Sequence, residues 1–488
     1  MSAMKEQILV TIEEVWRQHR AALEDALTEA IDALQNLLRL DEYHRHGHDP
    51  EQLERALGPL ANTSLDLGSL SRMLDQGARS RTMAPDRVER IEQLILTLGE
   101  MKELWSNAGL DTASIEMGEN EDEVRKRAEA YLNRLALVFR ALRITQLEVR
   151  SKYDSQAHDA IFAQFDWREI GPGEIQSAPP FVVLARMDGD AGPQLHRLVS
   201  LLDTGMPLKL VALRSSVRDA PAQLKIETLP LAMHDIHFVQ SCTVVPEFEK
   251  QVLACLAAPR PGVISLLCPR GDEEQAAFHA RAERAVRSRA FPICVYDPDR
   301  DPSFVMCFDL SSNPSPELPW TTETIPGQDP NGQAVELEQP FLFAQFAASE
   351  PEFASDLTDA PANSDDLVSL SEYLGFSRRQ RIGKLPFISL ADEPGPIVRK
   401  VVSQALVRQS AERVQLWRML QEISGIDNPY VKQGQTRVQN ELRAQHEAEL
   451  ESLRRELEND VALREKAAVV SAVHKLVARL TGIDPSRN

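Results

Sequence analysis

The sequence lacks the features that define several large classes of protein. No run of apolar residues approaches the roughly 20 that a membrane-spanning helix needs. The N-terminal stretch MSAMKEQILVTIEEVW is acidic and amphipathic, without the apolar core of a signal peptide. We find no phosphate-binding P-loop, no dinucleotide-binding glycine fingerprint and no Ser-His-Asp set. These absences favour a cytoplasmic protein without a membrane span.

Cysteine is also scarce, and its spacing excludes the common metal sites. The chain has five cysteines, no two of them in a CxxC pair, all within one 66-residue window: Cys242, Cys255, Cys268, Cys294 and Cys307. We therefore expect neither an iron–sulfur cluster nor haem, but reduced thiols in a core. If one thiol is reactive, Cys268 in LLCPRGDE is the best placed.

Positive charge is in deficit, and the deficit is local. The formal net charge is −20, which argues against broad binding to nucleic acid or to anionic membranes. Residues 301–377 contain 14 Asp and Glu and no Lys or Arg. This segment suits either the docking of a basic partner or a solvated linker.

The periodicity of the apolar residues divides the chain. Residues 1–155 show only helical spacing, over about 4–40, 85–105 and 121–150, and predict a helical domain. Short apolar runs then alternate with helices over 156–312, with expected strands at 181–186, 208–215, 237–242, 262–269 and 291–298. Such alternation predicts an α/β domain with a parallel sheet, which binds ligands at the carboxyl ends of its strands.

The remainder has three parts. Residues 313–384 are rich in Pro, Asp, Ser and Glu and are expected to be largely linker. Residues 385–431 predict a strand, 385–392, followed by one helix, 396–425. Residues 432–488 form a long amphipathic helix with 10 basic and 9 acidic residues, the pattern of a coiled-coil arm that pairs with a partner or with another copy.

Several pieces of residues 181–312 resemble, in the same order, the thiamine-diphosphate domain of the pyruvate:ferredoxin (flavodoxin) oxidoreductase family. They are the acidic turn MDGDAG, the stretch LLDTGMPLKLVALRSSV, LAMHDIHFVQS, PEFEKQVLACLAAPRPGVISLLCP and YDPDRDPSFVMCFDLSSNP. The helix ERVQLWRMLQEISGIDNP is similar to a tail fused to some large bacterial members. The resemblance implies a sheet of the thiamine-diphosphate type.

The resemblance also implies where thiamine diphosphate and its magnesium would bind. Asp188 or Asp190 would supply the first metal ligand, and the Ser215 hydroxyl and Val217 carbonyl the others. The diphosphate would lie against residues of the two turns: Gly189, Gly192, Ser215 and Ser216.

The sequence departs from the family's pattern at this point. The loop VRDAPAQ has no glycine, and Arg214 stands where the family usually has an acidic residue. The iron–sulfur cysteines are absent, and no pyrimidine-type domain is visible in residues 1–155.

Other interpretations of these residues stay open. Asp188, Asp190 and Ser215 also suit an ordinary strand-to-helix turn, or the binding of another phosphate or anion at a helix N-terminus. His44, His46 and His48 alternate in YHRHGHD and suit either a metal ion or a polar turn.

We therefore expect an accessory or split subunit of a 2-oxoacid:ferredoxin oxidoreductase-like system, which assembles with partner subunits through its helical ends. The alternatives are a scaffold or interaction protein without small-molecule chemistry, and an active enzyme with a variant thiamine-diphosphate and magnesium site. The sequence assigns no catalytic residue.

Overall fold

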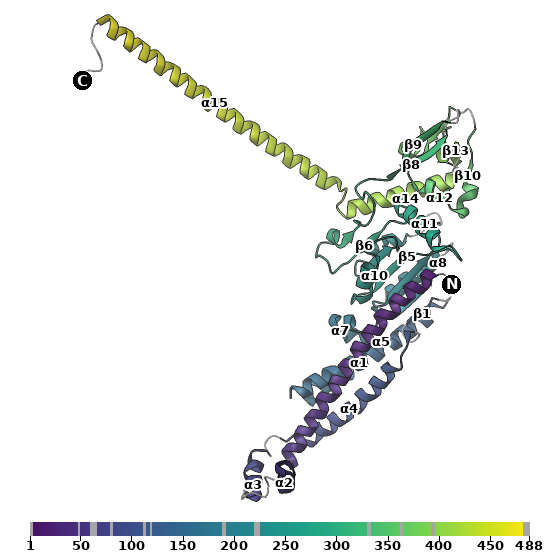
Figure 1. Ribbon diagram of the computed structural model, residues 1–488, viewed down its shortest axis with the longest axis vertical. Helices are drawn as coiled ribbons and strands as arrows, with labels where there is room; N and C mark the ends of the chain where they lie inside the picture. The colour runs from purple at the N-terminus through teal and green to yellow at the C-terminus, as the bar shows by residue number, and fades with distance from the viewer. Residues whose placement is uncertain are drawn as a thin grey trace. The chain divides into compact units, whose positions relative to one another are not determined.

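The computed structural model (Figure 1) describes residues 3–46, 49–58, 66–78, 82–110, 114–117, 120–187, 192–218, 225–328, 333–361, 365–391 and 396–481. The chain divides into two compact units, 1–420 and 421–488. The first unit holds every described strand. Among the described helices, none combines the length and the apolarity that crossing a membrane requires.

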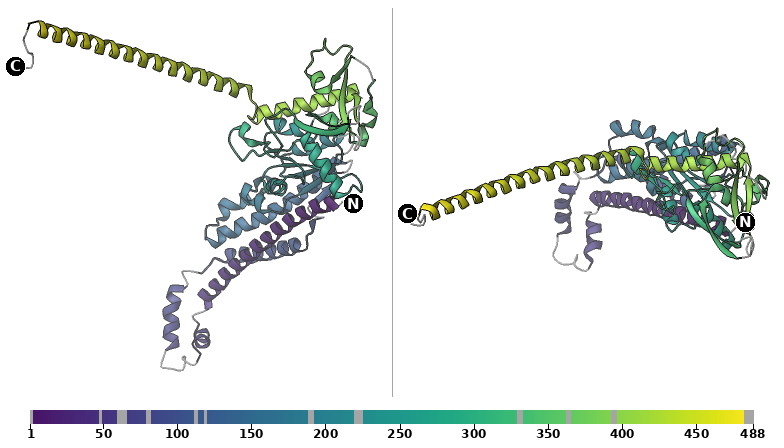
Figure 2. Two further views of the ribbon diagram at one scale, coloured as in Figure 1. Left: turned by 45° about the horizontal axis from the view of Figure 1, so that its top comes forward. Right: turned by 90° about the horizontal axis from the view of Figure 1, so that it is seen from above.

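Three long helices form the N-terminal part, as expected. Helices α1 (Ala3–His46), α4 (Pro85–Ser106) and α5 (Glu121–Val149) pack against one another and lie side by side in Figures 1 and 2. Their apolar faces are buried at residues that recur with helical spacing: Leu27, Leu34, Ile91, Leu98, Leu135 and Val138. The short helices α2 (Pro50–Leu57) and α3 (Leu67–Ala78) follow α1.

The central sheet has seven strands and is mostly parallel. Its order is β1-β2-β3-β5-β4-β6-β7. The strands are β1 (Ser114–Glu116), β2 (Val182–Arg186), β3 (Lys209–Arg214), β4 (His237–Ser241), β5 (Gly262–Leu267), β6 (Cys294–Tyr296) and β7 (Phe308–Asp309). Strands β1 to β5 run parallel, whereas β6 is antiparallel to both of its neighbours. The mixed α/β class and the mainly parallel sheet expected from the sequence are confirmed.

Helices connect the parallel strands. Helix α8 (Gly192–Leu202) joins β2 to β3, and α10 (Phe248–Ala257) joins β4 to β5. These two connections move along the sheet in opposite directions. Because such crossovers are right-handed, α8 and α10 cover opposite faces. Helix α11 (Gln275–Arg287) follows β5, and the shorter helices are α6 (Ser155–Ala163), α7 (Pro172–Ser177) and α9 (Leu229–Ala232).

The segment expected to be largely linker, 313–384, is instead rich in regular structure. It forms the hairpin β8 (Thr321–Gln328) and β9 (Ala334–Phe341), helices α12 (Phe343–Ala347) and α13 (Leu370–Gly375), and strands β10 (Leu357–Asp359) and β11 (Leu367–Ser369). The expectation rested on composition, but every residue of α12 is buried. The short apolar helix α12 therefore suffices to anchor this segment in the hydrophobic core, although the segment as a whole is polar.

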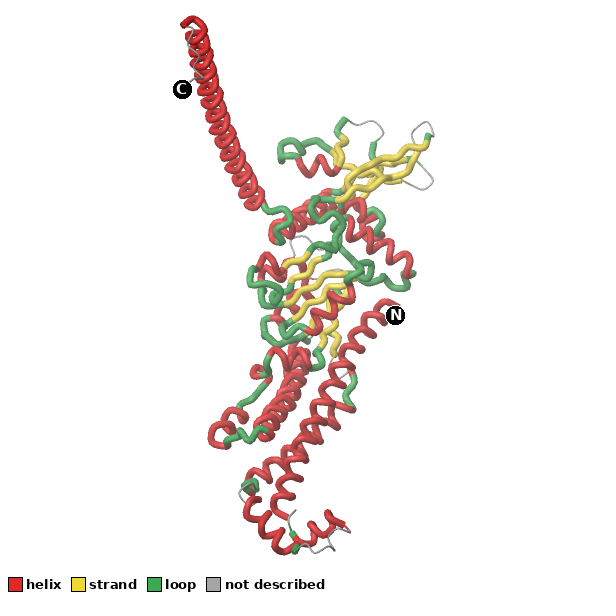
Figure 3. The backbone as a smooth tube through the Cα atoms, turned by 60° about the vertical axis from the view of Figure 1, so that its left-hand side comes forward, coloured by secondary structure: helices red, strands yellow, loops and turns green. Residues whose placement is uncertain are grey.

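The single helix expected over 396–425 is also wrong. Residues Ile397–Val402 form strand β13, and helix α14 (Gln404–Ile423) begins only afterwards. The stretch IVRKVV is rich in β-branched residues, which favour a strand. Strands β10, β11 and β13 form a second sheet together with β12 (Leu385–Ala391), in the order β10-β13-β12-β11. Figure 3 shows this sheet apart from the central sheet.

The second unit contains the expected long C-terminal helix. Helix α15 (Pro429–Thr481) spans 53 residues, and none of them is buried. It begins at Pro429, shortly before the expected start at 432.

Candidate functional site at the carboxyl ends of the central strands

The two stretches expected to form a cofactor site follow neighbouring strands. Strands β2 and β3 pair in register, and the Met187 N–H donates to the Leu213 carbonyl at 2.9 Å. Asp188, Gly189 and Asp190 lie outside the described residues. Gly192 opens α8, and residues 215–217 follow the end of β3.

The described half of this site is bound by other parts of the same chain. The Ser215 carbonyl accepts hydrogen bonds from Arg270 at 3.2 Å and from Arg281 at 3.4 Å. The Ser216 hydroxyl donates to the Glu352 carboxylate at 2.8 Å. Both residues, expected to face a cofactor, therefore bond to an arginine or a glutamate.

The Val217 carbonyl is also bound by a charged side chain of the same chain. It accepts from Arg413 of α14 at 3.4 Å. Helix α14 lies almost 200 positions further along the chain, so this contact closes the end of β3 with the C-terminal part of the first unit.

The acidic segment contributes three carboxylates to this closure, those of Glu350, Glu352 and Asp356. Arg270, just beyond β5, forms ion pairs with Glu350 and with Glu352, the latter at 3.3 Å. Arg218 bonds the Glu352 carbonyl and forms an ion pair with Asp356 at 3.5 Å. The acidic segment 301–377 thus docks onto basic groups, but those groups belong to its own chain.

A second cluster of charges lies deeper, behind the end of β3. The carboxylate of Glu227 is 1% exposed and accepts from Arg214 at 3.4 Å and from Arg413 at 3.3 Å. The same oxygen accepts from the Gln240 amide at 3.0 Å. Arg214 is therefore a structural partner of this buried carboxylate.

Burial and the arginines act in opposite directions on the carboxyl pKa values. Burial raises the pKa of Glu350, and the neighbouring Arg270 only partly opposes that rise. Burial also acts to raise the pKa of Glu273, but the hydrogen bond from Arg281 and other interactions outweigh it and the pKa is lowered. Arg281 binds Glu273 at 2.9 Å and the Cys268 carbonyl at 2.8 Å.

The described half of the site, after β3, does not suit a magnesium ion. Of the expected metal ligands, the Val217 carbonyl already accepts from Arg413, and the Ser215 carbonyl, next to the expected hydroxyl ligand, accepts from Arg270. A divalent cation placed there would have to compete for these oxygens with the guanidinium groups of Arg270 and Arg413. Among the described residues, moreover, no group of three or more His, Cys, Asp or Glu side chains is arranged to hold a metal ion, and His48 lies outside that set.

Sequence reasoning missed the groups that close the site. Arg270, Arg281 and Glu352 carry no motif, and Ser216 and Glu352 are 136 positions apart. The available signal was the charge pattern, because a segment without Lys or Arg needs cations from elsewhere if it is to be buried.

The five cysteines lie in the core, as the expected reduced thiols would. All five are free thiols and buried, Cys268 among them. Burial raises the pKa of Cys242 and of Cys255 to about 12, so both remain neutral thiols at physiological pH.

A further group of buried titratable residues lies at the opposite, amino-terminal edge of the sheet. The Lys209 ammonium donates to the carbonyls of Ala258 at 2.6 Å and Arg260 at 2.7 Å, and burial lowers its pKa to about 8. Burial likewise lowers the pKa of His237 to about 4. Because Lys209 binds two carbonyls of the loop between α10 and β5 and His237 lies within β4, we assign both a structural role.

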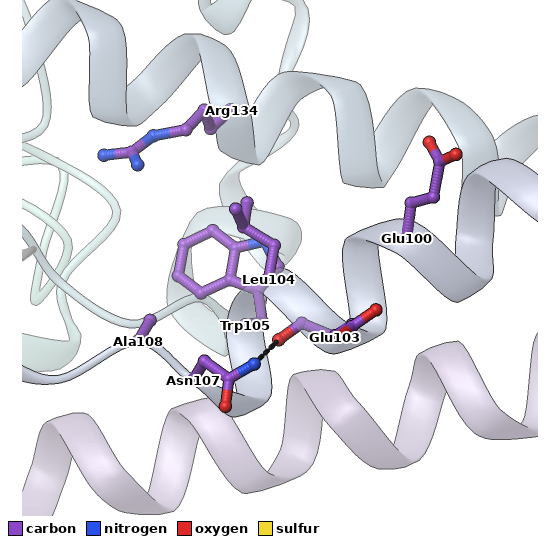
Figure 4. A pocket seen from close by; sticks show the side chains of 7 residues that line it. All are labelled: Glu100, Glu103, Leu104, Trp105, Asn107, Ala108 and Arg134. Carbon is purple, nitrogen blue, oxygen red and sulfur yellow. Dashed lines mark hydrogen bonds between the residues drawn. The ribbon is translucent and has the colours of Figure 1, made fainter.

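A groove in the helical part is a further concave feature (Figure 4). It is lined by residues of α4, of the turn after it and of α5: Glu100, Glu103, Leu104, Trp105, Asn107, Ala108 and Arg134. The one hydrogen bond drawn there joins the Asn107 amide to the Glu103 carbonyl at 3.0 Å. The lining offers no nucleophile paired with a base, so it supports no catalytic assignment.

No known family model matches the chain, and no curated protein sequence is significantly similar to it.

Proposed function

We propose that the protein is a non-catalytic accessory subunit of a 2-oxoacid:ferredoxin oxidoreductase-like assembly. In this proposal the α/β domain has the thiamine-diphosphate type of fold, and its cofactor end is closed by the chain's own acidic segment. The observation that carries the proposal is the commitment of Ser215, Ser216 and Val217 to Arg270, Glu352 and Arg413.

Two kinds of support meet in this proposal. The resemblance of residues 181–312 to the oxidoreductase family is ordered along the sequence, and that region contains strands β2 to β7 of the mainly parallel sheet. The departures from the family's pattern coincide with the closed strand end. Arg214, the foremost of them, binds the buried Glu227 and so stabilises the closed arrangement.

A scaffold protein unrelated to 2-oxoacid chemistry is the second candidate. It is favoured by α15, a helix of 53 residues in which no residue is buried. The two candidates differ in their partners, since only the first requires contact with subunits that carry iron–sulfur centres.

Calorimetric titration of the full chain with thiamine diphosphate and Mg²⁺ tests whether the chain still binds the cofactor that catalysis would require. We expect no binding at micromolar concentrations. Micromolar binding that Asp188→Ala or Asp190→Ala abolishes would overturn the proposal and favour an enzyme with a variant site.

Co-purification tests the accessory role separately. The full chain, expressed with the subunits of a 2-oxoacid:ferredoxin oxidoreductase of the same cell, is expected to elute with them in a fixed ratio. Elution apart from them, with no thiamine diphosphate bound, would leave the scaffold as the function.

A further inference from the structure

Helix α15 has a row of exposed apolar side chains. Eight side chains between 450 and 480, each at least 47% exposed, make up this row: Leu450, Leu453, Leu457, Val461, Val469, Val473, Val477 and Leu480. Leu463, Val470 and Leu476 are exposed as well but are not part of it. A helix of this kind gains most of its stability from packing of its apolar face, and exposed apolar rows mark interaction surfaces. The row therefore requires a partner.

The row is symmetric about Glu465. The nearest pair, Val461 and Val469, lies four residues from Glu465 on either side, and Leu457 and Val473 lie eight residues away. The outer two pairs follow the same rule: Leu453 and Val477 are 12 residues from it, and Leu450 and Leu480 are 15. When two copies of the helix lie antiparallel with Glu465 at the centre, every apolar residue of the row meets an apolar residue of the other copy at the same level.

The spacing of the row is compatible with one continuous seam. From Leu450 to Leu480 the row makes eight steps over 30 residues, about 3.75 residues a step when Glu465 is counted as the central layer. This exceeds the 3.6 residues of an α-helical turn, so the row winds slowly around the helix. Two such helices would coil around each other in the right-handed sense.

Charge decides the relative direction of the two helices. Residues 450–464 contain four acidic and three basic residues, a net charge of −1. Residues 466–480 contain three basic and no acidic residues, a net charge of +3. A parallel pair would place +3 against +3, whereas an antiparallel pair places −1 against +3 at both ends.

We propose that α15 binds α15 of a second copy of this chain, antiparallel and centred on Glu465. This inference concerns the second unit alone and does not depend on the proposed accessory function. The overlap of residues 450–480 would extend over about 45 Å.

Disulfide cross-linking of the full-length protein tests the direction. The five native cysteines are buried, so introduced thiols react alone. In an antiparallel pair, position 450 of one copy lies beside position 480 of the other, whereas equal positions lie about 45 Å apart. We expect the double variant L450C/L480C to form a disulfide-linked dimer and each single variant to form none. Cross-linking of each single variant to itself would show a parallel pair and overturn the proposal.

A variant pair tests the seam. Leu457→Asp with Val473→Asp introduces charges into two equivalent layers of the row, one on each side of Glu465, and we expect the dimer measured by light scattering to weaken at least about 100-fold. Asn459→Asp with Ser471→Asp adds the same charges on the opposite face of the helix, again symmetrically about Glu465, and should leave the dimer unchanged. Circular dichroism of both variants checks that the rest of the chain is folded.

Two results contradict the proposal. One is a monomer of 54.6 kDa for the native chain at tens of micromolar. The other is a dimer that the seam variant and the control variant affect equally. A monomer that instead forms a one-to-one complex with a different protein through the same row would overturn the self-pairing and assign that protein as the occupant.

Discussion

The acidic segment and the C-terminal helix have opposite relations between composition and burial. Residues 343–356 belong to a stretch with 14 acidic residues and no basic one, yet α12, Phe353 and Glu350 are buried. Helix α15 has balanced charges and a row of large apolar residues, yet none of its residues is buried. The comparison shows that a polar composition does not imply exposure where arginines of the same chain lie in position to bind it.

The two regions also differ in whether their side chains find partners within the same chain. In the acidic segment, Glu350, Glu352 and Asp356 are paired within their own unit, with Arg218 and Arg270. The apolar row of α15 stays exposed to solvent along the whole described helix. We therefore locate assembly at the helix and stability at the closed strand end.

The largest effect is expected from breaking the deepest charge cluster. In Glu227→Gln, the guanidiniums of Arg214 and Arg413 lose the carboxylate that they share. Removing one partner of a buried ion pair costs about 3–5 kcal/mol, so the free energy of unfolding should fall by roughly that amount. Urea unfolding measures it. Glu92→Gln, at an exposed position of α4, is the matched control, and an equal effect of both variants would show that the cluster is not stabilising.

The next effect concerns His237, at the amino-terminal edge of the central sheet, and should be seen in how the free energy of unfolding depends on pH. The pKa of His237 is about 4 in the folded chain, below its ordinary value of 6.5. At pH 5 the unfolded chain binds a proton that the folded chain does not, so stability falls as the pH drops from 6.5 towards 4. Between pH 6.5 and about pH 5, this proton uptake should lower the free energy of unfolding by about 2 kcal/mol.

The variant His237→Asn should lose that part of the pH dependence between about pH 7 and pH 5. The exposed His279→Asn serves as the control and should keep the native dependence. Identical pH profiles for the native chain and His237→Asn would contradict the assignment.

A smaller effect is expected where the acidic segment meets β3. Ser216→Ala removes the hydroxyl that donates to Glu352. A hydrogen bond to a charged group contributes about 1.5–3 kcal/mol when buried, and we expect about 1 kcal/mol here because Glu352 is partly exposed. A double-mutant cycle with Glu352→Gln measures the coupling between the two side chains, and a coupling near zero would show that the contact does not hold the segment.

The smallest expected effect is a gain. Glu465 is the charged residue at the central layer of the proposed α15 pair. Glu465→Leu should tighten the dimer about tenfold, since a polar residue in such a seam lowers stability in favour of register. Sedimentation of the variant over a dilution series measures the change, and a weaker dimer would place Glu465 outside the seam.

Much of the central sheet was predictable, because its strands are continuous apolar runs. Strand β2, expected at 181–186, is Val182–Arg186, and β3, expected at 208–215, is Lys209–Arg214. Strand β1 was missed because three residues, Ser114–Glu116, carry no detectable alternation. It joins the sheet only through pairing with β2.

The sequence indicated where in the sheet the candidate site lies, but not which side chains bind the residues there. The two turns were expected at the carboxyl ends of two strands, and the structure shows that these strands, β2 and β3, are neighbours. What fills the end of β3 depends on Glu352 and Arg413, which lie 136 positions from Ser216 and 196 from Val217. Spacing along the chain carries no information about such pairs, and only the unequal distribution of charge indicated that they exist.

Hydrogen–deuterium exchange across residues 343–356, measured on the full chain with and without thiamine diphosphate and Mg²⁺, tests the central claim most directly. The closed strand end predicts slow exchange over α12 and residues 350–353, unchanged by the cofactor, and faster exchange in Ser216→Ala. Fast exchange of this segment in the native chain, or a change when thiamine diphosphate and Mg²⁺ are added, would contradict the claim that the chain closes its own site.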